Sequence, residues 1–540
     1  MDDLQTFTSA GQTPSNISES VKFLLSQLKQ LQHQKQHRAK EVVHADEANQ
    51  RAYFFYEKLR NAVEYKEQHL FLRNAIQRFL NRNLRLIRRD EDLAKELVVE
   101  LIKTRYIAND SISVDVLVEV NRLLNDYKTL LDEVSKRHSG VNKEKIIDAV
   151  FEIASSDVER LLVSRAQDEL FVNFTYGVML ERLSPALLTS SDSLEVRRAL
   201  FISIHRLLLK SDVARIRYYL FYAEFSNWRS QGGASVVAVA SSLEGFTSAV
   251  EKSLRSKLTR QIGKLLRRHI APFRVLHRLV LSEDNPAEIL NDRPKLKRRI
   301  ENVCQSEYEA TRDRVRTSVF RSIIFIFITK LSLAIILEIP YDHLVEGEVN
   351  WTPLAINLAF PPLYMLLIGL SVRIPSDANT KKIVDDIRTT ISAHNPDKQQ
   401  PIGSQEPPSS LRNIFGFLYL SGFVLMIYLL VNLLVAFDFN IVSGVLFFIF
   451  FSTVSFFGVR ISTLANELVV LDERPGIIGL TVDVISAPFI RIGQWLSDTY
   501  SKINILNFAL DVLIELPFKT ILRIFDEWSQ YLKEKRDDLL

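Results

Sequence analysis

The spacing of apolar residues changes sharply along this chain, from single positions in the first 317 residues to long continuous runs after Val319. In the amino-terminal part apolar residues recur every three or four positions, which is typical of helices that bury one face. We find no alternating pattern long enough to predict a sheet. An α-helical bundle or helical array is therefore expected, with breaks near Gly140 and Gly232. The two clearest runs are Leu70, Leu72, Ala75, Ile76, Phe79, Leu80 and Leu84, and Val116, Val120, Leu123, Leu124, Tyr127, Leu130, Leu131 and Val134.

Short polar segments predict where these helices start and end. Asn109-Asp110-Ser111 offers residues that cap a helix amino terminus, and Ser139-Gly140 offers a termination. Gln231-Gly232-Gly233 predicts a flexible break. The soluble part is thus expected to contain two subdomains that meet near one of the two glycine breaks.

Four long apolar runs follow, and each is close to the roughly 20 residues that a helix needs to cross a bilayer. The runs are Val319 to Leu337, Leu354 to Val372, Ile414 to Phe437 and Ile441 to Val459. Four transmembrane helices are predicted, which pair as two hairpins. A Pro/Ser/Gln-rich linker separates the hairpins, and its composition is unsuited to forming a core.

Beyond the fourth run, two similar segments predict amphipathic helices. Ala487-Pro488-Phe489 and Leu516-Pro517-Phe518 each place proline in a first helical turn, ahead of apolar and aromatic residues on one face. We expect these helices to lie along the inner leaflet; the alternative is that they pack on the cytoplasmic bundle. The expected anchors at headgroup level are Trp495, Tyr500, Trp528 and Tyr531.

Together these patterns predict an all-α protein: a helical cytoplasmic bundle, four transmembrane helices and carboxy-terminal amphipathic helices on the membrane surface. The expected parts are a flexible amino terminus (1–19), a helical cytoplasmic domain (20–250), basic juxtamembrane helices (251–317), a first transmembrane hairpin (318–372), a cytoplasmic linker (373–413), a second hairpin (414–460) and carboxy-terminal amphipathic helices (461–540).

The distribution of charge sets the expected orientation. The net charge of the 540 residues is only +4, but the stretch from Glu251 to Arg321 holds 18 Lys and Arg against 9 Asp and Glu. The loop from Glu338 to Thr352 has acidic residues and neither Lys nor Arg. Because basic flanks stay on the cytoplasmic side, both termini are expected to be cytoplasmic, in a multi-pass protein of the plasma membrane.

The basic belt itself resembles a nucleic-acid surface when it is taken alone. Its position just before a membrane span favours contact with lipid headgroups and a role in topology, without nucleic acid. The belt residues are Arg255, Lys257, Arg260, Lys264, Arg267, Arg268, Lys295, Lys297, Arg298 and Arg299.

Polar residues inside the spans are the main candidates for a site. Lys330 lies 9 to 11 residues into the first run, about 14–16 Å deep, where an ammonium group is costly unless it is paired or solvated. The second run holds Asn357, Tyr364 and the Pro361-Pro362 pair, which frees backbone carbonyls. These residues predict either a substrate or ion pathway, or a lysine that caps the freed carbonyls or extends outward.

Other chemistry is sparse in the sequence. No phosphate-binding glycine loop, HExxH motif or GxSxG motif is present, and the single Cys304 has no histidine nearby in sequence, so neither an enzyme nor a cofactor is predicted. His33, His37, Glu41 and His44 have spacings that put them near one face of a helix, with side chains suited to zinc or iron. The stretch is polar on all sides, so a solvated helix face is the simpler interpretation.

Three functions remain open at this point. The first is a non-enzymatic assembly or scaffold protein that binds membrane lipids and binds protein partners through its cytoplasmic helical domain, either as a single chain or as a homo-oligomer. The second is a channel or transporter with a pathway near Lys330 and Pro361-Pro362. The third, with the least support, is a membrane-bound enzyme or metal site that uses the histidine cluster.

Overall fold

The computed structural model describes most of the chain as helix. The described residues are 18–36, 41–45, 50–51, 53–54, 57–58, 70–85, 93–163, 165–183, 193–229, 233–283, 285–392, 409–471, 486–487 and 489–496. Among them no strand occurs, and a single antiparallel bridge joins Val42 to Ser113. The expected all-α class is therefore confirmed for these residues. The described residues fall into two compact units, one within residues 19–266 and one within residues 267–496 together with Ser18.

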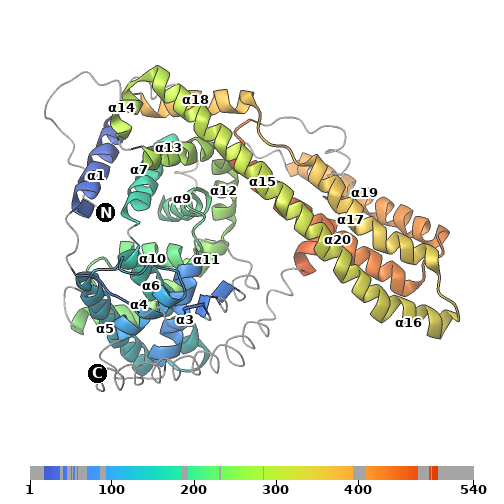
Figure 1. Ribbon diagram of the computed structural model, residues 1–540, viewed down its shortest axis with the longest axis horizontal. Helices are drawn as coiled ribbons and strands as arrows, with labels where there is room; N and C mark the ends of the chain where they lie inside the picture. Colours follow the sequence, from blue (N-terminus) through green and yellow to red (C-terminus); the bar gives the residue numbers. More distant parts are fainter. Residues whose placement is uncertain are drawn as a thin grey trace, which may run out of the picture. The chain divides into compact units, whose positions relative to one another are not determined.

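The first unit is built around one central helix. α6 (Gly140–Leu162) packs against α3 (Phe71–Arg85), α5 (Val114–Arg137), α10 (Val213–Glu224) and α11 (Gly233–Arg255) (Figure 1). Its core-facing positions lie on several sides of the helix, which suits a helix that has neighbours around it. The remaining helices are α1 (Glu19–Gln36), α4 (Leu93–Lys103), α7 (Ala166–Arg182), α9 (Ser193–Leu208) and α12 (Lys257–His269).

The apolar spacing of α5 predicts its buried face correctly. From Val120 to Val134 the seven apolar residues of the expected run are all buried, while Val116 is half-buried. The predicted amino-terminal cap is wrong by two residues, since the Ser113 hydroxyl accepts from the Val116 amide. The helix begins later because the Val43 amide donates to the Ile112 carbonyl at 2.8 Å, which keeps that segment extended.

His205 is a buried histidine in this unit. Its ring lies between Phe201 and Tyr219, at centroid distances of 4.4 and 4.6 Å, and its Nδ1 is 3.4 Å from the Ser211 hydroxyl. Burial, and next the positive charge of Arg215, lower the pKa of His205 to about 3. The folded unit therefore holds this imidazole in its neutral form.

We expect acid to destabilise the first unit through His205. Between pH 6.5 and about 3, this imidazole takes up a proton in the unfolded chain but stays neutral in the folded chain, so the free energy of unfolding falls as the pH falls. The total loss is several kcal/mol, on the order of 1.4 kcal/mol per pKa unit. Thermal unfolding of the full chain at a series of pH values measures this slope. His205→Phe should flatten it, whereas substitution of the exposed His44 by Asn should not. An equal slope in His205→Phe would contradict the assignment.

The second unit contains the helices that are able to cross a membrane. Its elements are α13 (Ala271–Ser282), α14 (Pro286–Asn291), α15 (Arg293–Leu333), α16 (Ile339–Tyr341), α17 (Trp351–Ser371), α18 (Asp377–Ile391), α19 (Ser409–Ala436) and α20 (Ile441–Ala465) (Figure 1). Three stretches are long and apolar enough to span: Arg293–Glu346, Trp351–Ser371 and Ile441–Thr463. The described apolar part of α19, Leu420–Ala436, is shorter. The chain is thus compatible with a membrane protein that has three such helices among its described residues.

The first span is longer than its apolar run predicts. That run ends at Leu337 and was expected to be followed by a loop, but the helix continues to Glu346 through two π-helical turns, Ala334–Glu338 and Asp342–Glu346. Pro340 lacks an amide hydrogen, and the wider turns carry the helix past it. The expected loop therefore starts too early, and Glu338 and Asp342 lie buried along the helix.

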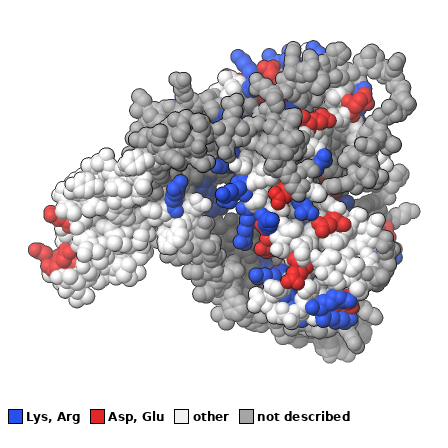
Figure 2. Space-filling view, turned by 180° about the vertical axis from the view of Figure 1, so that it is seen from behind, with Lys and Arg blue, Asp and Glu red and all other residues white. Residues whose placement is uncertain are grey.

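Small residues bring the membrane-spanning helices close together. A Cβ added at Gly369 would lie 2.7 Å from Val319, and one at Gly458 would lie 2.8 Å from Ile368. These contacts join α17 to α15 and to α20, which also pack on each other. On the face shown in Figure 2, the described part of this bundle is free of charged side chains along most of its length, with acidic side chains at one end. Such a surface is suited to hydrocarbon.

Candidate functional site

An ion pair lies inside the bundle of helices that are apolar enough to cross a membrane. The Lys330 ammonium on α15 donates to Glu338 Oε1 at 2.6 Å, and neither side chain has any exposed surface. The same Nζ lies 5.1 Å from the centroid of the Phe450 ring on α20. The carboxylate and the aromatic face both stabilise the cation where water is absent.

Glu338 is the residue that the sequence pattern misses. It follows the apolar run directly and has the appearance of a loop residue, eight positions from Lys330. In a regular α-helix, residues three or four apart are neighbours, whereas eight positions give a lateral offset. The π-helical turn Ala334–Glu338 changes that register and turns the carboxylate toward Lys330. The only available signal was an acidic residue slightly more than two helical turns after a lysine in an apolar run.

Asn357 joins this pair to two further helices. Its amide nitrogen donates to Glu338 Oε1 and to the Ser443 carbonyl, both at 3.0 Å. The side chain belongs to α17, and Ser443 lies in the first turn of α20, so one amide connects three helices. Among the described residues, Glu338 Oε2 and Asn357 Oδ1 are buried without a hydrogen-bond partner.

The other candidates of the second span form a separate polar contact. Tyr364 is buried, and its hydroxyl is 3.2 Å from the Ser455 hydroxyl and 2.7 Å from that of Ser486. Pro361 is buried and Pro362 half-buried, and α17 passes through both as one continuous helix. The two prolines therefore do not interrupt the helix. In these contacts of the described residues, Tyr364 and Lys330 belong to separate polar groups.

A third polar contact lies toward the end of the first span. The Asn440 amide donates to Asp342 Oδ1 at 2.6 Å, and the Asn350 amide donates to the Asp438 carbonyl at 3.2 Å. These bonds tie the turn between α19 and α20 to the helices before it. Asp342 is buried by this contact, whereas Glu346 and Glu348 remain exposed.

The histidine cluster does not share one helix. α1 ends at Gln36, and Glu41 and His44 belong to an extended segment, where the Val114 amide donates to the Glu41 carbonyl. His44 Nδ1 lies 3.1 Å from Asp110 Oδ1. The side chain of His33 and all of His37 lie outside the described residues. Within the described part of the chain, no group of three or more His, Cys, Asp or Glu side chains is placed to hold a metal.

The basic belt separates into two groups. Lys295 and Lys297 on α15 pair with Glu288 and Glu301, and Arg299 pairs with Glu283 at 3.0 Å. Arg298 is exposed on the same turn. The other six belt residues, on α12 or at the end of α11, are exposed: Arg255, Lys257, Arg260, Lys264, Arg267 and Arg268.

One of the expected interfacial anchors is described. Trp495 is 65% exposed on the short helix of residues 489–496. The other side of that helix packs on α20, because Phe489 is buried 4.2 Å from the Phe451 ring and Gly493 lies directly against the Ser452 backbone. The anchors Tyr500, Trp528 and Tyr531, with the second amphipathic segment, lie outside the described residues.

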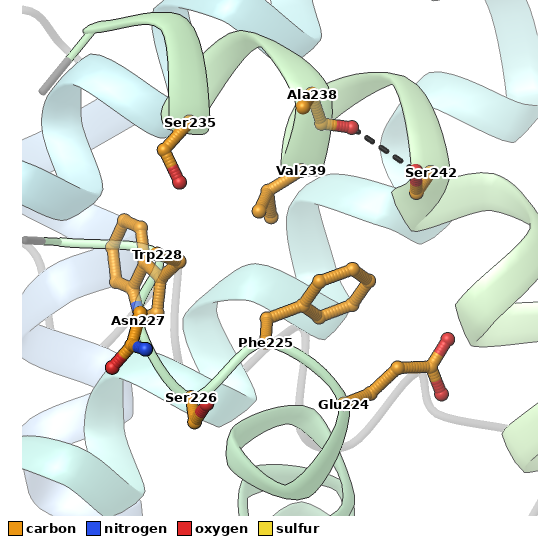
Figure 3. A pocket seen from close by; sticks show the side chains of 9 residues that line it. All are labelled: Glu224, Phe225, Ser226, Asn227, Trp228, Ser235, Ala238, Val239 and Ser242. Carbon is orange, nitrogen blue, oxygen red and sulfur yellow. Dashed lines mark hydrogen bonds between the residues drawn. The ribbon is translucent and has the colours of Figure 1, made fainter. Parts of the chain in front are cut away.

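An open pocket of about 290 Å³ lies in the first unit beside Trp228 (Figure 3). The Phe225 ring points into it below Val239, and the Ser242 hydroxyl is turned away to the Ala238 carbonyl. Glu224, at its edge, is 3.4 Å from Arg198. The pocket brings together no nucleophile with a base, so its chemistry suits packing or weak binding. Its lining residues are Glu224, Phe225, Ser226, Asn227, Trp228, Ser235, Ala238, Val239 and Ser242.

Asp157 on α6 is a buried carboxylate held by internal partners. Burial raises the pKa of Asp157, which accepts hydrogen bonds from the hydroxyls of Tyr127 and Tyr222 and lies 3.7 Å from Arg229. Only 2% of Asp157 is exposed. Its hydrogen bonds therefore connect α6 to α5 and α10 inside the unit.

Comparison with family models, curated proteins and solved structures finds no match to this chain. The intramembrane polar cluster, defined here as Lys330, Glu338 and Asn357, is therefore interpreted from its own geometry.

Proposed function

We propose that this chain is a non-enzymatic assembly protein whose helical unit, residues 19–266, binds protein partners while its apolar helices hold it in a membrane. The observation that carries this proposal is the complete burial of Lys330 and Glu338. A pathway residue needs contact with water or substrate in at least one state, whereas this pair is fully buried and Asn357 joins it to two further helices. The intramembrane polar cluster thus holds the apolar helices together.

The helical unit, residues 19–266, supports the same proposal. Its described buried carboxylates, Glu57, Asp157 and Glu159, are each bound to internal partners. Its described residues form no catalytic constellation, and a folded helical surface of this size is suited to recognition.

A channel or transporter is the second candidate, and one observation favours it. Glu338 Oε2 and Asn357 Oδ1 are orphaned acceptors at membrane depth, and an occluded polar site has such atoms. In that case the polar cluster binds water or a cation when the protein adopts another conformation.

The two candidate functions predict different results for variants of the polar cluster and for a deletion of residues 1–250. We expect affinity purification from native membranes to recover the same partners with wild type and with Lys330→Met/Glu338→Met, and to lose them when residues 1–250 are deleted. Proteoliposomes should show no cation or proton flux that depends on Glu338. Flux that disappears in a folded Glu338→Gln variant would overturn the assembly proposal and establish the transporter.

A further inference from the structure

Five exposed cations lie together where α11 ends and α12 begins. They are Lys252, Arg255, Lys257, Arg260 and Lys264. Between residues 252 and 264 no acidic residue occurs. None of the five forms an ion pair with a described carboxylate, whereas three of the four belt residues on α15 do. We call these five residues the α12 cationic surface.

The cations of α12 share one side of the helix. Lys257, Arg260 and Lys264 are spaced by three and four residues, so they lie within about 60° of one another around the helix axis. The buried residues Thr259 and Ile262 lie on the opposite side. The helix therefore presents its charges outward over about 10 Å.

The apolar side of α12 is already occupied by the protein. The Thr259 hydroxyl donates to the Ser253 carbonyl at 2.7 Å, and the Ser203 hydroxyl donates to the Thr259 carbonyl at 3.3 Å. Ile262 is 2% exposed. A helix whose apolar face is used in this way cannot insert that face into a bilayer, so any membrane contact must be made by charge alone.

We propose that the α12 cationic surface binds the anionic headgroups of the membrane in which this chain is held. Charge complementarity identifies the occupant, because unpaired lysine and arginine side chains are attracted to a negatively charged leaflet. The exposed side carries no aromatic residue on which a base of single-stranded nucleic acid would stack. The contact is electrostatic and reversible, and it weakens with salt since the Debye length is about 10 Å at 0.1 M.

Lysine footprinting of the wild-type full chain tests this proposal. The protein is placed in nanodiscs of phosphatidylcholine, with or without phosphatidylglycerol, and acetylation of each lysine is followed by mass spectrometry. We expect anionic lipid to slow acetylation of Lys257 and Lys264 by about fivefold or more at low salt, and high salt to restore it. Lys295 and Lys297 provide the internal control, because they are also exposed but are paired with acids. Their rates should stay within about twofold.

Several outcomes would overturn the proposal. Unchanged rates at Lys257 and Lys264, or an equal decrease at Lys295 and Lys297, would show that the surface does not bind headgroups. Protection by an RNA duplex in phosphatidylcholine nanodiscs, without protection by phosphatidylglycerol, would assign the surface to nucleic acid. As a matched pair, Arg255→Gln/Arg260→Gln should reduce the protection of Lys257, whereas Arg298→Gln/Arg299→Gln should preserve it. These results do not depend on whether the chain assembles partners or transports ions.

Discussion

Substitution of Lys330 by Met destabilises the membrane-spanning unit by about 3–5 kcal/mol, because it leaves the Glu338 carboxylate buried and unpaired. Met has a similar length and fills the space of the lysine stem, so the loss reports the charge rather than a cavity. Unfolding in mixed micelles of a mild detergent and dodecyl sulfate measures the change. Glu338→Met should cost a similar amount, since it leaves the ammonium group without its carboxylate.

The double variant distinguishes stabilisation by the ion pair from stabilisation by side-chain packing. Lys330→Met/Glu338→Met removes both charges and should recover most of the lost stability, since buried pairs replaced by apolar residues are often neutral. Asn357 keeps its bond to the Ser443 carbonyl in that variant. Arg321→Met, which removes an exposed cation from the same helix, is the matched control and should change stability by less than about 0.5 kcal/mol. If the stability losses of the two single variants added up in the double variant, the ion pair would not be the source of the stability.

Substitution of Glu159 by Met destabilises the helical unit by a comparable 3–5 kcal/mol or so. Glu159 on α6 is 1% exposed and accepts from Arg215 Nε at 3.0 Å and Nη2 at 2.7 Å. Its removal leaves a buried guanidinium on α10 without that bidentate partner. Thermal or denaturant unfolding of the full chain, followed by fluorescence of the buried Trp228, measures the loss.

An exposed pair of the same type provides the control for Glu159. Arg198 and Glu224 are 39% and 44% exposed and 3.4 Å apart, so Glu224→Gln should cost no more than about 1 kcal/mol. Glu159→Met/Arg215→Met should be more stable than Glu159→Met alone, because it also removes the guanidinium that has lost its bidentate carboxylate. Equal losses from Glu159→Met and Glu224→Gln would show that burial of the ion pair has no energetic consequence.

Helical class and much of the buried face follow from periodicity. The run in α5 is buried almost as its three- and four-residue spacing predicts, because a helix packed on one side needs apolar residues there and nowhere else. The start of α5 was mispredicted, since Val43 holds Ile112 in an extended segment from far along the sequence. Local spacing carries no information about such a contact.

The sequence indicates two of the three residues of the intramembrane polar cluster. Lys330 and Asn357 stand out because polar residues in apolar runs are costly. Glu338 does not, because its eight-residue separation from Lys330 becomes a contact only through a π-helical turn that propensities do not indicate. Similarly, the charge count locates the basic belt, but whether a given cation is paired depends on how Glu283 and Glu288 fold back toward α15.

The unbroken course of α15 has a mechanical consequence. From Arg293 to Leu333 the helix contains no hinge, so a twist applied at its amino-terminal end is carried over about 55 Å to Lys330. The next turn is π-helical and holds the lysine's own partner. Relaxing that turn to α-helical register rotates Glu338 by about 100° and separates the two charges. The ion pair, whose two residues lie on this one helix, therefore resists unwinding of that turn.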